Sequence, residues 1–297
     1  MTFENFINDI ANRAAEANAV ETGDYIGDDG LLYCGNCNTP KQCRVELFGK
    51  ERIVYCLCKC KAEKREAERI AQLQAEKAMH IQKLRRLGFP DAEMQKWTFD
   101  KDDGKNEKIT MIARKYVENF AEMKKQGKGL LLFGSVGTGK TFISACIANA
   151  LIDKGYACLV TNFSRLVNTI QGMFDGRQDY IDSLNRFDLL VIDDLASERD
   201  TEYMGEIIQT IIDSRYRANL PLIITTNLTN EELKHPAEIR KQRIYSRLLE
   251  MCVPIRVAGA DRRKQILIDE LDETTEMLGL SVAELLDLNV AERNEEK

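Results

Sequence analysis

Long apolar runs are missing from this sequence of 297 residues. No stretch approaches the roughly eighteen apolar residues that a membrane-spanning helix needs. The N-terminal stretch MTFENFINDIANRAAE also lacks the basic start and the apolar centre of a secretory signal. These absences predict a cytoplasmic protein with no membrane partner. Histidine is scarce as well, because His80 and His235 are the only two, and both are expected to be ordinary surface residues.

Cysteine is not scarce, since the chain has nine. Disulfides are rare in the cytoplasm, so these cysteines are not expected to form a disulfide framework. Three of them, Cys146, Cys158 and Cys252, fall in apolar runs that are typical of a core, and the others lie between residues 31 and 60. The net charge of −6 argues against a protein that coats nucleic acid with its whole surface, although it allows a local basic groove.

A phosphate-binding loop stands in the middle of the chain. The stretch GSVGTGKT (134–141) matches G-x-x-x-x-G-K-[ST], follows the apolar strand GLLLF and opens a helix. In such a loop the glycines let backbone N–H groups turn toward phosphates, and the helix N-terminus adds its dipole. Lys140 is expected to reach the β- and γ-phosphates of ATP, and the Thr141 hydroxyl to ligate Mg²⁺. The predicted nucleotide-binding residues are contiguous: Gly134, Ser135, Val136, Gly137, Thr138, Gly139, Lys140, Thr141 and Phe142.

Apolar strands alternate with helices from about residue 89 to residue 265. The strands are expected at 129–133, 157–162, 187–195 and 221–227, with helices between them. This alternation predicts an α/β fold in which a parallel sheet is sandwiched by helices.

Two carboxylates end the strand FDLLVIDDL (187–195). Asp193 occupies the position that holds Mg²⁺ in phosphate-loop enzymes. Asp194, facing the other way along an extended strand, could polarise the attacking water or could cap the next turn. Glu198 is a weaker candidate for the same water. The strand PLIITTN could place Asn227 against the γ-phosphate and this water.

Two arginines lie four residues apart in the stretch RIYSRLLEMC (243–252). Arg243 and Arg247 share one helical face. In a ring or filament, one of them could enter the nucleotide site of the neighbouring subunit as an arginine finger, or it could be a surface arginine in a salt bridge. Arg262 and Arg263 follow an apolar strand and are further candidates for sensing phosphate.

The cysteine-rich stretch has the spacing of a zinc site. Cys34 and Cys37 form a C-x-x-C knuckle, and a second group of cysteines follows about twenty residues later. Between them, CRVELFGKERIVY is typical of two strands joined at Gly49, a hairpin that would bring the groups together. Because so small a unit has little core, a metal ion would supply its stability. Buried or redox-active cysteines are the alternative.

The second pair of zinc ligands comes from Cys56, Cys58 and Cys60. Residues two apart in a strand share a face, so any two of the three could point at the metal. We expect Cys58 and Cys60, with Cys56 as the alternate, and we do not expect Cys43 to be a ligand. The predicted Zn²⁺ ligands are the following four residues: Cys34, Cys37, Cys58 and Cys60.

The motifs GSVGTGKT, LLVIDDLASE, LIITTN and RIYSRL resemble those of the AAA+ ATPases of the DnaC/DnaI-type helicase loader and IstB group. The resemblance covers residues 95–263. In this group the lead-in KWTFD lies near the adenine, which makes Trp97 and Phe99 the candidates in this sequence. The motif match also implies that Asn227 is the sensor and Arg247 the finger.

The resemblance implies a function. Members of the group include ATP-dependent oligomers that carry a ring-shaped replicative helicase of the DnaB type onto single-stranded DNA. We therefore expect a weak ATPase, stimulated by assembly or DNA, that uses ATP, Mg²⁺ and Zn²⁺ and self-associates into a ring or filament. Zinc-bearing N-terminal units occur in DnaI-type and phage loaders, where they face the helicase. Two alternatives are an IstB-type helper of a DNA transposase and a nucleotide-binding regulator with negligible turnover.

These expectations divide the chain into four segments. Residues 1–60 are expected to form an N-terminal helix and a zinc-binding domain, and the helix either packs on its own protein or docks a partner. Residues 61–90 are expected to be a charged helical linker, since residues 61–87 contain both charge signs and no Gly or Pro, and Gly88 and Pro90 then end the helix. Residues 91–265 are the expected AAA+ ATPase domain, and residues 266–297 an acidic C-terminal extension.

Overall fold

The structure is a computed structural model that describes residues 20–47, 49–195, 202–236, 238–262 and 277. Several predicted features lie outside the described residues, namely the N-terminal helix, Glu198, Arg263 and most of the acidic extension. The chain divides into two units, residues 1–79 and residues 80–297. In the part of the chain that the structure describes, no helix has both the length and the apolar character that a membrane span needs.

In the described residues of the first unit, 20–47 and 49–79, four short strands form two pairs. β1 (Tyr25–Ile26) pairs antiparallel with β2 (Leu32–Tyr33), and β3 (Gln42–Leu47) pairs antiparallel with β4 (Lys50–Tyr55). The second pair is the hairpin expected between the two groups of cysteines. Gly49 has a φ of +73°, the left-handed conformation that a tight hairpin turn needs.

A helix of 30 residues, α2 (Lys59–Gly88), follows the hairpin. Most of its side chains are exposed, as its mixture of charges predicts. In its last turns, Ile81 and Leu84 pack against a hydrophobic cluster of the second unit. The helix ends at the buried Gly88, where a Cβ would lie 2.3 Å from the carbonyl oxygen of Cys158. Only glycine fits at this close approach.

Five parallel strands form the sheet of the second unit, in the order β6-β7-β8-β5-β9. In chain order, the strands are β5 (Gly129–Phe133), β6 (Cys158–Asn162), β7 (Leu189–Leu195), β8 (Leu222–Thr226) and β9 (Cys252–Arg256). The predicted α/β fold is therefore confirmed, and this strand order is AAA+-like. Since β7, β8 and β5 are neighbours, the polar motifs that follow them meet at one edge of the sheet.

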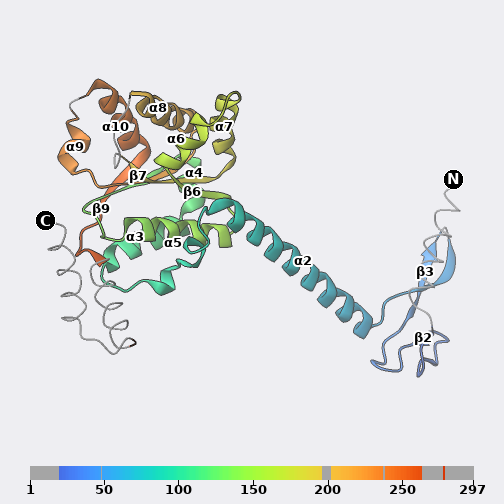
Figure 1. The fold of residues 1–297 in the computed structure, drawn as a ribbon. Coiled ribbons are helices and arrows are strands. Elements are labelled where there is room, and N and C mark those ends of the chain that lie inside the picture. The colour runs from blue at the N-terminus through green and yellow to red at the C-terminus, as the bar shows by residue number, and fades with distance from the viewer. Residues whose placement is uncertain (1–19, 48, 196–201, 237, 263–276, 278–297) are drawn as a thin grey trace. The chain divides into compact units, whose positions relative to one another are not determined.

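Helices cover both faces of this sheet (Figure 1). One face packs against α3 (Glu107–Glu118), α4 (Phe120–Lys125) and α5 (Lys140–Asp153). The opposite face packs against α6 (Phe163–Gln171), α7 (Arg177–Ser183), α8 (Glu202–Arg217), α9 (Asn230–Lys234) and α10 (Ile239–Met251). The described part of this unit also contains three single turns of 3-10 helix: η1 (Met94–Lys96), η2 (Phe99–Lys101) and η3 (Leu184–Arg186).

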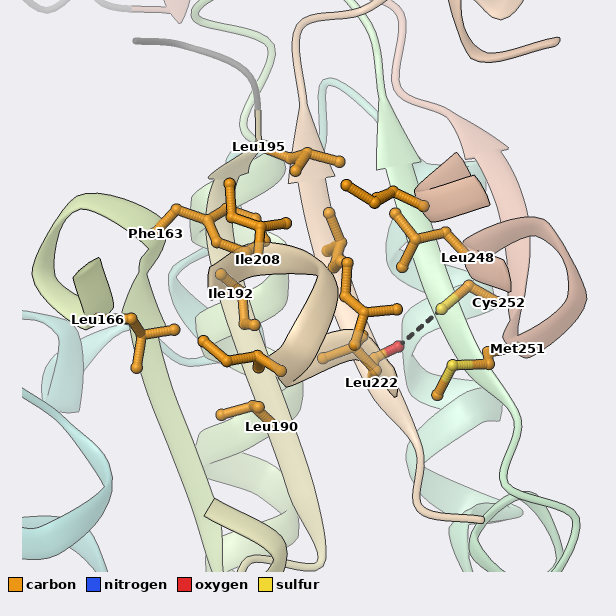
Figure 2. Packing of buried hydrophobic residues seen from close by; sticks show 14 of the residues in the cluster. Phe163, Leu166, Leu190, Ile192, Leu195, Ile208, Leu222, Leu248, Met251 and Cys252 are labelled. Atoms are coloured by element: carbon orange, nitrogen blue, oxygen red, sulfur yellow. Dashed lines mark hydrogen bonds between the residues drawn. The ribbon is translucent and has the colours of Figure 1, made fainter. Parts of the chain in front are cut away.

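Alternating strand residues supply the two hydrophobic clusters. Leu130 and Leu132 of β5 join the cluster around α3 and α5, whereas Leu131 joins the cluster around α6, α8 and α10. Figure 2 shows the second cluster, where Leu190 and Ile192 of β7 lie beside helices from the same face. Every residue of β5 and β8 is buried, so the strand that leads into the phosphate loop is enclosed on both sides.

The three cysteines expected in the core are buried there. Cys146 and Cys158 are completely buried, and Cys252 is 2% exposed. The Cys252 thiol lies 3.1 Å from the carbonyl oxygen of Leu222, an interaction drawn in Figure 2. Burial raises the pKa of Cys146 and Cys252 to about 12, so both thiols are protonated and unreactive near neutral pH.

A buried arginine ties α8 to the amino ends of two strands. The guanidinium of Arg215 donates to the carbonyl oxygens of Phe187 at 2.9 Å and Pro221 at 2.7 Å. Longer contacts of 3.3 and 3.4 Å reach the carbonyl oxygens of Leu184 and Asp188. Burial lowers the pKa of Arg215 to about 10, which leaves it charged at neutral pH. Its planar fork is what allows one side chain to reach four carbonyl groups.

Candidate nucleotide and metal sites

The phosphate-binding loop connects β5 to α5. Gly134, Gly137 and Gly139 have φ angles of 147°, 78° and 92°, which strain any residue that has a Cβ. A Cβ at position 137 would also lie 1.7 Å from the carboxylate of Asp261, and one at position 139 would lie 3.2 Å from the guanidinium of Arg262. The loop therefore requires its glycines, and the segment after β9 packs closely over it.

Lys140 is the first residue of α5 and is only 6% exposed. Its ammonium donates to the carbonyl oxygens of Gly134 at 2.9 Å and Ser135 at 2.7 Å. The positive charge therefore lies inside the loop, beside the helix N-terminus. An anion held by the loop would meet this charge, the helix dipole and backbone N–H groups together.

Asp193, near the end of β7, faces the first turn of α5. The Thr141 hydroxyl lies 3.0 Å from each oxygen of its carboxylate, and the Thr225 hydroxyl donates to it at 2.5 Å. Burial raises the pKa of Asp193, while these two hydroxyl groups act in the opposite direction. A divalent cation would favour the ionised carboxylate, and the oxygens of Thr141 and Asp193 are the ligand type that Mg²⁺ prefers.

Asp194 lies within β7, as the predicted strand implies, but its backbone is not extended there, so the expectation that its side chain faces away from that of Asp193 was wrong. Its φ is +66°, and the pairing of β7 with β8 shifts register between Ile192 and Leu195. A bulge of this kind redirects a side chain. As a result, Asp194 borders the same cavity as Asp193, and the Asn227 amide donates to its carboxylate at 3.2 Å.

Thr225 is a site residue that the motif analysis missed. Its hydroxyl donates to Asp193 and accepts a hydrogen bond of 2.9 Å from the backbone N–H of Asp194. One side chain of β8 therefore fixes both carboxylate residues of β7. Thr225 is 1% exposed, and the signal for it was the first polar residue after the apolar start of the strand PLIITTN.

The loop, the two aspartates and Asn227 border one cavity of about 620 Å³, a size suited to a nucleotide. Its lining residues are Trp97, Lys101, Asp103, Lys105, Val136, Gly137, Thr138, Gly139, Lys140, Thr141, Phe142, Asp193, Asp194, Thr225, Asn227 and Arg262. Gly134 and Ser135 are outside this lining and contribute the carbonyl groups that bind Lys140. Lys101, Asp103 and Lys105 are cavity residues that no motif indicated.

Two aromatic rings border the cavity on the side of the lead-in. The ring centroids of Trp97 and Phe142 lie 5.9 Å apart, and their planes are inclined by 43°. Such apolar ring surfaces suit a planar base. Phe99 is outside the lining, because its ring lies under the guanidinium of Arg114 at 4.8 Å from the centroid. Of the two aromatic residues proposed for the adenine, the structure therefore brings only Trp97 to the cavity.

Arg262 holds the segment after β9 over the phosphate loop. Its backbone N–H donates to the carbonyl oxygen of Gly137 at 3.0 Å. Its guanidinium lies 3.1 Å from the carboxylate of Asp103 and 3.5 Å from that of Asp102. Arg262, a predicted candidate for sensing phosphate, therefore borders the cavity. The sequence analysis did not identify its partners Asp102 and Asp103.

Arg247 does not border the nucleotide cavity of its own chain. It forms an ion pair with Asp213 of α8, and its guanidinium lies 5.8 Å from the ring centroid of Tyr216. The Tyr216 hydroxyl donates to Glu250 at 2.7 Å. Arg243, the other predicted candidate, is exposed on the same helix. Both arginines therefore lie outside the set of side chains that the cavity gathers.

In the first unit the structure gathers the four predicted zinc ligands. The sulfur atoms of Cys34, Cys37, Cys58 and Cys60 all lie within 4.8 Å of one another. The Cys60 sulfur is 3.6 Å from that of Cys34 and 3.4 Å from that of Cys58. Four thiolates at about 2.3 Å from a tetrahedral Zn²⁺ are roughly 3.8 Å apart, so the cluster fits this ion.

The backbone around the second pair of cysteines is not the strand that the sequence analysis assumed. β4 ends at Tyr55, and α2 begins at Lys59, so Cys58 precedes the helix and Cys60 lies in its first turn. The helical turn brings these two sulfurs together. Cys56, the alternate ligand, points elsewhere, with its thiol 3.5 Å from the carbonyl oxygen of Pro40.

Hydrogen bonds around the cluster distribute the protons unevenly. The Thr39 hydroxyl, 3.0 Å away, lowers the pKa of Cys37 to about 6. Hydrogen bonds with Cys58, Cys37 and Cys34 raise the pKa of Cys60 to about 12. A bound metal cation requires its cysteine ligands as thiolates, so metal binding at this cluster would release the protons that the thiols hold.

A buried ion pair supports the first knuckle. The side chain of Lys41 is fully buried, and its ammonium lies 2.5 Å from the carboxylate of Asp24. That carboxylate also accepts a hydrogen bond of 3.2 Å from the backbone N–H of Gly35, between the two knuckle cysteines. His80 and His235 are exposed, as expected for surface residues.

Comparison with known families gives one match over most of the chain. The family described as "IstB-like ATP binding protein" matches residues 61–267. The matched stretch contains the phosphate loop, the two aspartates, Asn227 and both candidate finger arginines.

Curated relatives match about half of the chain. The replicative helicase loader DnaI of Bacillus subtilis (strain 168) is 29% identical over 160 residues, which cover 50% of this chain and 51% of DnaI. The replicative helicase loader DnaC of Buchnera aphidicola subsp. Schizaphis graminum (strain Sg) is 28% identical over 173 residues, which cover 55% of this chain and 68% of DnaC. Among solved structures, DnaI is 24% identical with a TM-score of 0.49, covering 58% of this chain and 96% of that chain. Measured against the full-length DnaI of Bacillus subtilis, the chain spans about half of the relative's length.

Replacing Lys140 with alanine should weaken ATP binding by roughly tenfold to a hundredfold, since a buried charge at the loop is lost. Isothermal titration calorimetry with ATP and Mg²⁺ measures this change. Lys115→Ala, at an exposed position of α3, is the matched control and should bind ATP as the unsubstituted chain does. Equal ATP affinity in the Lys140 variant would contradict the assignment of the phosphate loop.

Zinc analysis of the purified chain should find about one Zn²⁺ per chain, because four cysteine sulfurs converge at one point. Cys58→Ser should lose this zinc and become sensitive to proteases in residues 20–58, since the metal stabilises a unit with little core. Cys43→Ser, which removes a thiol outside the cluster, should keep it. Equal zinc content in the two variants would show that the cluster is not the metal site.

Proposed function

The chain belongs to the IstB-like ATP-binding family, and from this premise we propose that it is an ATP-dependent helicase loader. It delivers a hexameric replicative helicase of the DnaB type onto single-stranded DNA during replication initiation. The observation that carries the proposal is that its curated relatives DnaI and DnaC are named replicative helicase loaders. The identity of 28–29% over about half of the chain supports a shared ATPase region, and the loading activity is our inference from it.

The cavity supports hydrolysis of ATP to ADP and phosphate. We assign Lys140 to the β- and γ-phosphates, and Thr141 with Asp193 to a Mg²⁺ ion, which would neutralise charge between the phosphates. Asp194 and Asn227, joined by a hydrogen bond of 3.2 Å, would orient and polarise the attacking water. Trp97 and Phe142 would hold the adenine.

The position of Arg247 supports assembly as a condition for hydrolysis. This arginine is outside its own cavity and is held against α8 by Asp213 and Tyr216. In a ring or filament it would approach the γ-phosphate bound by a neighbouring subunit and stabilise charge in the transition state. A single chain would then hydrolyse ATP slowly, and self-association would raise the rate.

The four-cysteine unit supports a docking role for the N-terminal region. It folds around its own cluster and is a separate unit from the one that holds the nucleotide cavity. We propose that residues 1–60 bind the helicase, that residues 61–90 link them to the ATPase, and that lysines and arginines of residues 91–265 contact single-stranded DNA. Such DNA binding would weaken steeply as salt rises.

One observation favours a second function. The matching family is described by the name IstB, so the chain could instead be an ATPase helper of a DNA transposase. The cysteine unit favours the loader, because a docking module for a helicase is not needed by a protein that remodels duplex DNA. Bending of duplex DNA without affinity for a helicase would support the helper.

Arg247→Ala should leave ATP affinity unchanged and reduce hydrolysis in the assembled state by a factor on the order of 10³. Steady-state ATPase assays at rising protein concentration separate the assembled rate from the basal rate. Mixing this variant with Lys140→Ala should restore part of the activity, because the second variant contributes an intact finger to its neighbour. If Arg243→Ala loses the activity and Arg247→Ala retains it, the finger is Arg243.

The loader function itself is tested by mixing the purified protein with the replicative helicase of its host and measuring complex mass with and without ATP. We expect a defined complex whose stability depends on ATP. A variant lacking residues 1–60 should not form it, while the same variant should still bind ATP. Absence of any complex in both conditions would reject the loader in favour of the transposition helper.

A further inference from the structure

Asn149 is a buried amide in the middle of α5, the helix that follows the phosphate loop. It is 1% exposed. Asparagine is a poor residue for a helix interior, and an amide removed from water is costly unless it is hydrogen-bonded. The Nδ2 group of Asn149 has partners outside the helix, whereas its Oδ1 has none among the described residues.

These partners are the backbone of the turn that carries Trp97. The Nδ2 of Asn149 donates at 2.9 Å to the carbonyl oxygen of Met94 and at 2.9 Å to that of Trp97. A longer contact of 3.2 Å reaches the carbonyl oxygen of Ala145 on its own helix. The two shorter bonds end at the first residue of η1 and at the residue that terminates this turn. One side chain thus fastens the whole turn to α5.

The turn and the helix each supply one ring to the base end of the cavity. Trp97 belongs to the turn, and Phe142 belongs to α5 itself. The separation of these rings, 5.9 Å between centroids, depends on how the turn is seated on the helix. Met94 and Trp97 also pack against the hydrophobic cluster around α5, but apolar contacts do not fix an orientation as two hydrogen bonds do.

We infer that Asn149 is a positioning residue for the nucleoside part of the ligand. It holds the Trp97 turn on α5, and so it sets the affinity for the base without touching the phosphates. The inference rests on the ATP-binding part of the proposed function and is independent of helicase loading.

The phosphate end of the cavity has its own supports. Lys140 is held by carbonyl groups of the loop, and the end of the lead-in is held by Arg262 against Asp102 and Asp103. The Thr110 hydroxyl further fixes Asp102 through a hydrogen bond of 2.5 Å. None of these contacts involves Asn149, so its loss should separate base binding from phosphate binding.

The experiment compares ATP with inorganic tripolyphosphate, which has the phosphates and no nucleoside. Asn149→Leu removes the amide at similar volume, and calorimetry measures both affinities. We expect ATP binding to weaken about tenfold, the effect of losing a hydrogen bond that positions the base, and tripolyphosphate binding to stay unchanged. Trp97 is the only tryptophan of the chain, so its fluorescence should shift to longer wavelength in the variant and respond less to ATP.

Ile152→Val is the matched control, because Ile152 is a completely buried residue of the same helix that makes no hydrogen bond to the turn. It should leave both affinities and the Trp97 spectrum unchanged. If Asn149→Leu does not fold, Asn149→Ser replaces it, since serine keeps a donor but is too short to reach both carbonyl groups.

An equal loss of affinity for both ligands, or no loss for either, would overturn the inference. Failure of the unsubstituted chain to bind ATP would instead reject the nucleotide site and with it the proposed function. A chain that binds ATP normally and forms no helicase complex would reject the loader and leave this inference intact.

Discussion

The nucleotide site depends on one local irregularity, the shift of register between β7 and β8. Regular pairing would have sent Asp193 and Asp194 to opposite faces of the sheet. The bulge instead brings both carboxylates to the same cavity, and the Thr225 hydroxyl holds them there by bonding to both residues. Strand β8 thereby fixes the two aspartates relative to each other, while β5 on its other side supplies the phosphate loop.

Much of this arrangement was predictable from local sequence. The phosphate loop, the apolar strands and the knuckle at Cys34 each carry their signal within a few residues, so the α/β fold and the loop could be identified directly. The grouping of Cys34, Cys37, Cys58 and Cys60 also agrees with the expected spacing. Their second pair is brought together by a helical turn and not by a strand, because the charged sequence after Cys58 favours helix.

Features that depend on contacts between distant segments could not be predicted. The side chain of Asp194 is redirected where the pairing of β7 with β8 shifts register. The hydrogen bond between Thr225 and the backbone of Asp194 can be inferred only when that pairing is known. The clamp of Arg262 on Asp102 and Asp103 joins residues from both ends of the second unit. The prediction that Phe99 lies near the adenine failed for the same reason. Its ring packs under the guanidinium of Arg114, so only Trp97 of the lead-in aromatic residues borders the cavity.

The buried Arg215 links the unfolding of α8 to that of the central sheet. Its guanidinium binds carbonyl groups at the amino ends of β7 and β8, so α8 cannot detach without leaving buried acceptors unpaired. Opening of α8 is therefore coupled to opening of these two strands. Asp213 and Tyr216, which hold Arg247, lie on this same helix. In the ring or filament that we propose, the support of Arg247 would therefore already be in place when a neighbouring subunit makes contact.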